Sequence, residues 1–156
     1  MKPNQQRFIL TVVRILFAIY IILLAYFCFF SEHFGRNLSS EYRYNLVLFK
    51  ELKRFVTYRK EVGIESFIVN IIGNVLAFTP FGFALPIIST RNRKFLSIVF
   101  LSFEFSLAIE LIQIIFKVGI FDVDDLFLNT LGGMFGGICF FLCSGIFGVM
   151  RRKAKG

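Results

Sequence analysis

The chain has 156 residues, of which 56% are hydrophobic and 18% are charged, with 23 phenylalanines and a net charge of +8. Soluble domains are about 45–50% apolar and about 25% charged, so this composition excludes a disordered chain. Its three cysteines, all in apolar runs, exclude a disulfide-built domain, and a single histidine without a CxxC motif argues against a zinc site.

Four long apolar segments predict four transmembrane helices. They cover residues 8–30, 66–88, 95–116 and about 126–150. As helices they are about 33–38 Å long, and the hydrocarbon core of a bilayer is about 30 Å thick. We therefore expect an all-α integral membrane protein, in which one four-transmembrane-helix bundle forms a single domain over residues 1–156.

Basic residues in the short connections predict the orientation. They lie at the N-terminus, in residues 91–94 and in residues 151–155. With four spans these segments share one side, which the positive-inside rule makes cytoplasmic. We therefore expect a multi-pass protein with both termini inside, and its positive charge requires no nucleic acid partner.

The connection between the first two spans, residues 31–65, is extracytoplasmic in this orientation. Within it, residues 42–62 combine apolar residues at helical spacing with lysines and arginines. This pattern predicts an amphipathic helix that lies in the membrane interface. A loop folded over the bundle fits the same residues.

Two charged residues lie inside the first and third spans, Arg14 and Glu104. Charges in a membrane usually pair with one another, so we predict an Arg14–Glu104 ion pair with a structural role. In the alternative, Arg14 extends to the cytoplasmic interface and Glu104 is protonated.

Polar residues mark one face in the second and third spans. Asn70 and Asn74 are one helical turn apart near the outer end of the second span, and Pro80 predicts a kink or break further along it, because proline removes a backbone donor. In the third span the spacing of the polar residues predicts a continuous stripe. The stripe consists of Ser102, Ser106, Glu110, Gln113 and Lys117.

Three aspartates, Asp122, Asp124 and Asp125, precede the fourth span, and Asn129 follows one turn later. Asp122 is placed to act as the helix N-cap, and the helix dipole favours the other two in the first turn. One aspartate would satisfy the cap, so three exceed it. Further along, small residues at GxxxG spacing predict close helix packing. They are Gly132, Gly133, Gly136 and Gly137.

In the predicted topology these polar residues meet at the extracytoplasmic ends of three helices. We expect one polar, outward-opening pocket there, in which the residues bind a ligand. The set comprises Asn70, Asn74, Glu110, Gln113, Asp122, Asp124, Asp125 and Asn129. The plain alternative is a hydrogen-bonded cluster that only holds the bundle together.

Several motifs in this region resemble the VanZ-like family of bacterial membrane proteins. The resemblance covers about residues 45–137 and consists of four segments. The first matches N-L-x-P-F, with Leu48 where proline is usual; the others match N-x-x-G-N-x-x-x-F-x-P-x-G, I-E-x-x-Q and D-x-D-D-x-x-x-N-x-x-G. They begin at Asn45, Asn70, Ile109 and Asp122. Many members carry a basic residue just before the aspartate run. This chain has none in residues 118–121, and the nearest basic residue before the run is Lys117.

The resemblance implies a protein of the bacterial cytoplasmic membrane and cell envelope. The family's name-giving member is tied to low-level resistance to teicoplanin, a glycopeptide antibiotic that binds cell-wall precursors. The first hypothesis is therefore an envelope protein whose outer pocket binds a glycopeptide or a lipid-linked precursor.

Two other hypotheses are open. In an intramembrane hydrolase or transferase acting on a polyprenyl phosphate, Glu110, Asp124 and Asp125 would be the catalytic candidates. Asp122, Asp124 and Asp125 could then hold Mg²⁺ or Ca²⁺ through oxygen ligands. A small transporter or flippase is the other hypothesis, and it would need a homodimer because four helices are few for alternating access.

Overall fold

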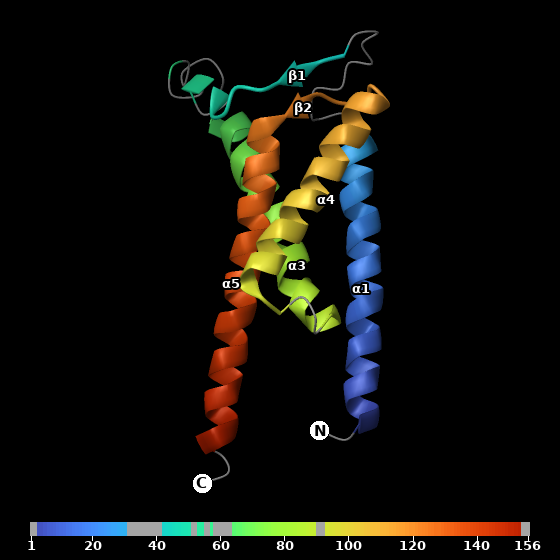
Figure 1. The fold of residues 1–156 in the computed structure, drawn as a ribbon, viewed down its shortest axis with the longest axis vertical. Coiled ribbons are helices and arrows are strands. Elements are labelled where there is room, and N and C mark those ends of the chain that lie inside the picture. Colours follow the sequence, from blue (N-terminus) through green and yellow to red (C-terminus); the bar gives the residue numbers. More distant parts are fainter. Residues whose placement is uncertain are drawn as a thin grey trace.

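The computed structural model describes residues 3–30, 42–50, 53–54, 57, 64–89 and 93–153. In chain order the elements are α1 (Pro3–Phe30), β1 (Tyr44–Asn45), α3 (Ile64–Ile88), α4 (Phe95–Ile115), β2 (Phe121–Asp122) and α5 (Val123–Lys153). Four helices of the described part are long and apolar enough to cross a membrane, which confirms the predicted all-helical fold. Both termini lie at one end of the molecule, here called the terminal end, and β1 and β2 lie at the other, the polar end (Figure 1).

Glycines allow α5 to pack closely against two helices. A Cβ added to Gly136 would lie 2.0 Å from the carbonyl oxygen of Thr79 on α3, and one added to Gly133 would lie 2.0 Å from the hydroxyl of Ser102 on α4. Gly132 meets α3 in the same way, and Gly137 meets α4. Because backbones approach closely only where side chains are missing, these glycines set the contacts of α5 with α3 and α4.

Of the kink or break predicted at Pro80, the break does not occur, because α3 is one continuous helix that contains Pro80. A proline inside a helix costs one backbone hydrogen bond and a steric clash, about 3 kcal/mol. Close packing around this turn offsets the cost: Gly82 lies against the backbone of Gly133, and Gly136 lies against that of Thr79.

α1 joins the bundle through the half that leads to the polar end. The ring of Phe17 lies 5.8 Å from that of Phe81, which stacks on Phe105 at 4.7 Å. The hydroxyl of Tyr20 donates a hydrogen bond of 2.5 Å to the carbonyl oxygen of Ala77 on α3. By contrast, residues 4–9 at the start of α1 are all exposed.

The segment between α1 and α3 differs from the predicted amphipathic helix. Its described start is extended: β1 pairs in parallel with β2, and a turn follows at residues 47–49. Lys50 and residues 53–54 and 57 are helical, and the rest of the predicted helix lies outside the described residues. The helix prediction is therefore wrong for residues 42–49. These residues form an extended segment and a turn that lie across the end of the bundle, and the alternative of a loop folded over the bundle describes them.

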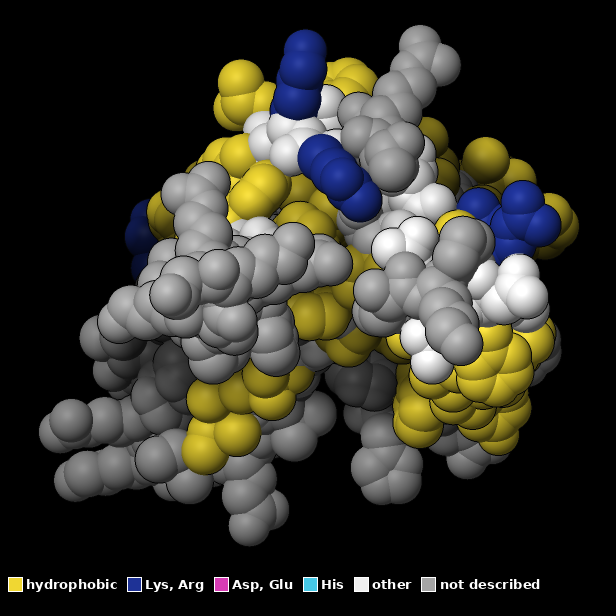
Figure 2. Space-filling model, turned by 90° about the horizontal axis from the view of Figure 1, so that it is seen from below, with side chains coloured by type: hydrophobic (Ala, Val, Ile, Leu, Met, Phe, Trp, Pro, Cys, Tyr) yellow, Lys and Arg dark blue, Asp and Glu magenta, His cyan; other side chains and the backbone are white. Residues whose placement is uncertain are grey.

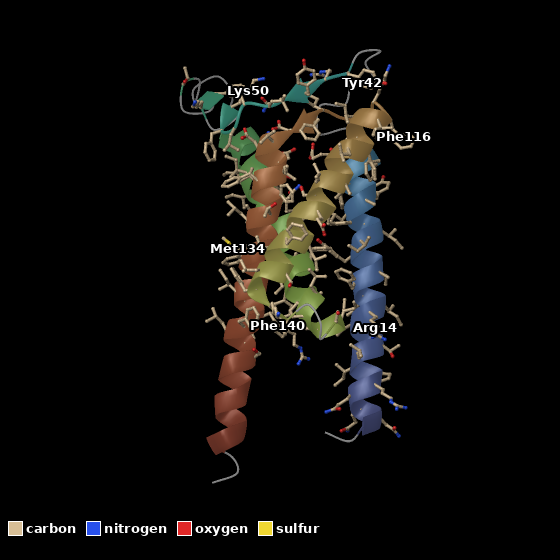
Figure 3. The ribbon with its side chains drawn as sticks, in the orientation of Figure 1. Arg14, Tyr42, Lys50, Phe116, Met134 and Phe140 are labelled. Atoms are coloured by element: carbon tan, nitrogen blue, oxygen red, sulfur yellow. The ribbon has the colours of Figure 1, made fainter. Side chains whose placement is uncertain are left out.

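The structure also corrects the predicted Arg14–Glu104 ion pair. Arg14 lies at the level of Phe140 along the long axis of the molecule (Figure 3). Glu104 lines a groove with Thr130, which is ten residues from Phe140 along α5 and therefore about 15 Å closer to the polar end. Both charged side chains are exposed, and no ion pair joins them in the part of the chain described.

The terminal end is basic. Figure 2, which views this end, shows Lys and Arg side chains among hydrophobic ones, and no described Asp or Glu side chain is visible there. Arg7 on α1 and Arg93 and Lys94 in the α3–α4 connection are described and exposed. Arg93 also donates a hydrogen bond of 3.2 Å to the carbonyl oxygen of Pro86.

Candidate functional site

The site forms where the chain turns from α4 into α5 at the polar end. α4 ends in a Schellman motif, in which the N–H of Val118 binds the carbonyl oxygen of Gln113 at 3.0 Å and Lys117 binds that of Ile114 at 3.2 Å. Lys117 occupies the position that usually holds glycine, with a φ of 55°. This tight turn brings β2 back over the end of α4.

Asp122 connects three parts of the chain. Its backbone N–H donates to a carboxylate oxygen of Glu110 on α4 at 2.8 Å. Its own carboxylate accepts the N–H of Asp124 at 2.8 Å and the side-chain amide of Asn45 at 3.0 Å. The hydrogen bond to Asp124 confirms Asp122 as the N-cap of α5, and the bond to Asn45 fastens β1 to the helix start.

Asp124 holds the turn that follows β1. Its carboxylate accepts a short hydrogen bond from the backbone N–H of Phe49. Phe49 has a φ of 62°, a left-handed conformation that is uncommon for a bulky residue. Its ring also packs edge-on against Phe127 at 5.4 Å. Residues 42–50, here called the strap, are thus fixed across the polar end by Asp122 and Asp124.

Asp125 connects α5 to α3, since it accepts a hydrogen bond of 2.5 Å from the side-chain amide of Asn74. Asn70 lies one turn nearer the start of α3 and is half-buried. Among the described residues, its side chain makes no hydrogen bond. The structure therefore brings Asn74 into the network and leaves Asn70 at its edge.

α4 and α5 meet in layers spaced four residues apart on both helices. Ser102 lies against Gly133, and Ser106 accepts a hydrogen bond of 3.0 Å from the side-chain amide of Asn129. Both serines are fully buried, and Asn129 is 5% exposed. The other amide atom, Oδ1 of Asn129, is buried without a hydrogen-bond partner. The polar stripe predicted on the third span thus faces the bundle interior.

Gln113 and Lys117 lie at the edge of the network. Gln113 donates a hydrogen bond of 3.0 Å to the carbonyl oxygen of Cys28 and so ties α4 to the end of α1. The ammonium group of Lys117 lies 4.6 Å from the centre of the Tyr42 ring, within the range of a cation–π contact.

The network is closed where the sequence predicted an outward-opening pocket. Glu110 is 2% exposed and Asp124 is 5% exposed, because β1 and the turn after it cover them. Two grooves among the described residues lie elsewhere, one along α4 and one near the start of α1. What the residues share is a set of hydrogen bonds, which joins α3, α4, α5 and the strap.

The three aspartates also do not gather around one point. Their carboxylates bind Asn45, the N–H of Phe49 and Asn74, respectively, in three directions. Among the described residues no three of His, Cys, Asp and Glu come together as metal ligands. The described arrangement therefore lacks the oxygen cage that the predicted Mg²⁺ or Ca²⁺ site requires.

Sequence reasoning missed the importance of Asn45 and Phe49. The other site residues were selected because they are polar and lie in or next to a predicted span, a criterion that Asn45 and Phe49 do not meet. The available signal was the N-L-x-P-F-like segment, which contains both residues. Their partners are more than seventy residues away in sequence, so no local spacing reveals the contact.

These observations define a four-helix membrane protein in which one end of the bundle is closed by carboxylate and amide groups. The VanZ/LLP1 family matches residues 17–144, most of the chain, and the chain belongs to this family. It is also 36% identical over 105 residues to Protein VanZ of Enterococcus faecium, an alignment that covers 58% of this chain and 62% of that protein. The chain therefore spans less than two thirds of this relative. No solved structure matches the chain.

Proposed function

We propose that the chain is a cell-envelope protein whose polar end binds an amphiphilic envelope ligand and thereby lowers susceptibility to teicoplanin. The ligand is the glycopeptide itself or a lipid-linked cell-wall precursor. Membership of the VanZ/LLP1 family supports the setting, and the strap supports binding as the mode of action.

The observation that carries the proposal is a row of exposed apolar side chains on the strap. Tyr44 is 65% exposed and Leu46 is 63% exposed, and their neighbours Tyr42 and Val47 are exposed as well. The hydrogen bonds to Asp122 and Asp124 hold their backbone in place. A preformed apolar surface at the edge of the bilayer suits a ligand with an acyl chain, because little ordering is needed on binding.

The proposed orientation places this surface outside the cell. Arg7, Arg93 and Lys94 lie on the side toward the terminal end, where α5 ends at Lys153. Short basic segments remain on the cytoplasmic side, which leaves the polar end facing the cell wall.

The hydrogen bonds favour binding over catalysis. Glu110 and the three aspartates each accept a hydrogen bond from the chain itself. A general acid or base must instead reach the proton that it moves in the substrate. We therefore assign Asp122 and Asp124 to holding the strap, and Glu110 and Asp125 to joining the helix ends beneath it. The ligand contact is given to the strap's exposed side chains.

Susceptibility tests with surface variants examine the proposal. Tyr44→Ala and Leu46→Ala remove exposed side chains and keep the backbone pairing of β1 with β2. We expect both to lose most of the protection against teicoplanin and to leave vancomycin susceptibility unchanged. Leu142→Ala is the matched control, because Leu142 is 62% exposed on α5 away from the strap.

Membrane levels of each variant must equal those of the wild type, measured on a tagged chain. Protection that persists in both strap variants would contradict the proposal. A purified chain in nanodiscs that binds neither teicoplanin nor a lipid-linked precursor would contradict it as well, since binding is the proposed mode of action.

A further inference from the structure

An exposed carboxylate on α4 lies in an apolar groove outside the polar end. Glu104 is exposed, and it shares the groove with Phe100, Phe103 and, across the gap, Thr130 of α5. Leu96 extends the same face of α4 and is 79% exposed. The groove measures about 760 Å³, which is large enough to receive side chains of a second helix.

Glu104 lies in the middle of its helix. Nine residues separate it from the start of α4 at Phe95 and eleven from the end at Ile115. At 1.5 Å per residue each end is therefore about 13–17 Å away, which places the carboxylate inside a hydrocarbon core of about 30 Å. Ionisable residues at that depth normally pair with one another or face a wet cavity, so Glu104 calls for a partner.

The chain offers no cation at this depth among its described residues. Arg14, the charged residue of α1 nearest the middle of its span, lies at the level of Phe140 (Figure 3). Phe140 is ten residues along α5 from Thr130, so Arg14 is about 15 Å nearer the terminal end than the groove. A second copy of the chain would not supply a cation either. A two-fold axis along the membrane normal places each residue of the second copy at the same depth as in the first. Such a copy presents its own Glu104 to this Glu104.

We propose that this face of α4 is a homodimer interface in which the two Glu104 carboxyl groups meet across the two-fold axis and share a proton. The protonated carboxyl donates a hydrogen bond to its ionised partner, so the pair carries one negative charge in place of two. The interface is self-complementary: Phe100 and Leu96 of each copy fill the groove of the other. It lies away from the strap and does not rest on the proposed ligand.

The test measures self-association of the full chain in liposomes. Copies labelled with donor and acceptor fluorophores are diluted into increasing amounts of lipid, and energy transfer reports the dimer. Glu104→Gln keeps a group that both donates and accepts, and should dimerise as the wild type does. Glu104→Leu removes the interhelical hydrogen bond and should dissociate at about tenfold higher protein-to-lipid ratio. Thr11→Leu, at an exposed polar position on α1, is the matched control and should change nothing.

Cross-linking gives an independent readout of the face. With the three native cysteines replaced by alanine, Phe100→Cys should form a disulfide between copies, and Ile19→Cys on α1 should not. The inference is overturned if the wild type is monomeric at every lipid ratio, if Glu104→Leu dimerises as strongly as the wild type, or if Ile19→Cys cross-links in preference to Phe100→Cys. Each variant is first shown to elute as one symmetric peak, so that misfolding is not read as dissociation.

Discussion

Replacing Gly133 by alanine tests the contact between α4 and α5. The new Cβ would lie 2.0 Å from the hydroxyl and 2.4 Å from the Cβ of Ser102, which is fully buried. Overpacking of this kind costs about 3 kcal/mol at the upper end of its range. Alanine regains about 1 kcal/mol of helix propensity over glycine, so the net loss is about 2 kcal/mol. For a chain of this size that corresponds to a Tm lowered by about 4–8 °C.

The same contact predicts a rescue. The atoms that clash with the new Cβ belong to the Ser102 side chain, so Ser102→Gly should remove the clash in Gly133→Ala. The double variant places the glycine on α4 and the larger residue on α5, and the summed helix propensity is nearly conserved. The double variant should melt within about 4 °C of the wild type, since it loses only the hydrogen bond from Ser102 to Ile98, about 1 kcal/mol. The Tm is followed by circular dichroism in detergent.

Gly145→Ala is the control for helix propensity, because a Cβ there meets nothing within 4 Å. It should melt at or above the wild-type temperature. The reasoning is refuted if Gly133→Ala melts with the wild type, or if Ser102→Gly fails to raise the Tm of Gly133→Ala. The single Ser102→Gly variant completes the double-mutant cycle.

Three further predictions concern the strap, the contact of α1 with α3 and the orientation in the membrane. Asp124→Asn replaces the charge-assisted acceptor of the Phe49 N–H with a neutral amide oxygen, which weakens this hydrogen bond by about 1 kcal/mol. Amide exchange in the strap should accelerate while α5 keeps its protection; unchanged exchange would show that the carboxylate does not hold the turn. Tyr20→Phe removes the hydrogen bond to Ala77, worth about 1 kcal/mol, and should lower the Tm by about 2–4 °C; a Tm equal to that of the wild type would mean that water replaces the hydroxyl. A fluorescent protein fused to the C-terminus should fold and fluoresce in bacteria, because it stays in the cytoplasm, and a periplasmic reporter at the same point should be inactive; the opposite result would reverse the orientation.

The sequence contains enough information for the helices and for the local geometry of the fourth span. Length and hydropathy determine the four spans, since few other structures bury so many consecutive apolar residues. The capping role of Asp122 also follows from local chemistry, because the side chain binds a backbone N–H only two residues away. The faces of Ser106 and Asn129 follow from helical periodicity, which orients side chains wherever a helix is continuous.

Contacts between distant segments could not be predicted in this way. Helical spacing of Lys and apolar residues allows either an amphipathic helix or a loop folded over the bundle in this segment. Asp122 and Asp124 bind the strap in the non-helical form. The depth of Arg14 relative to Glu104 depends on the relative position of α1 and α4 along the membrane normal. Hydropathy carries no information about this position. Pro80 stays within a helix because packing with α5 outweighs the local penalty.

The long sequence separation between Phe49 and Asp124, 75 residues, has a consequence for biosynthesis. A ribosome adds about 5–20 residues per second, so the strap is synthesised about 4–15 s before the carboxylates that will hold it. Throughout that interval Phe49 has no acceptor to keep it in its left-handed conformation. The strap is thus held only after Asp122 and Asp124 have been made, and a chain truncated before β2 leaves it open to proteases on its side of the membrane.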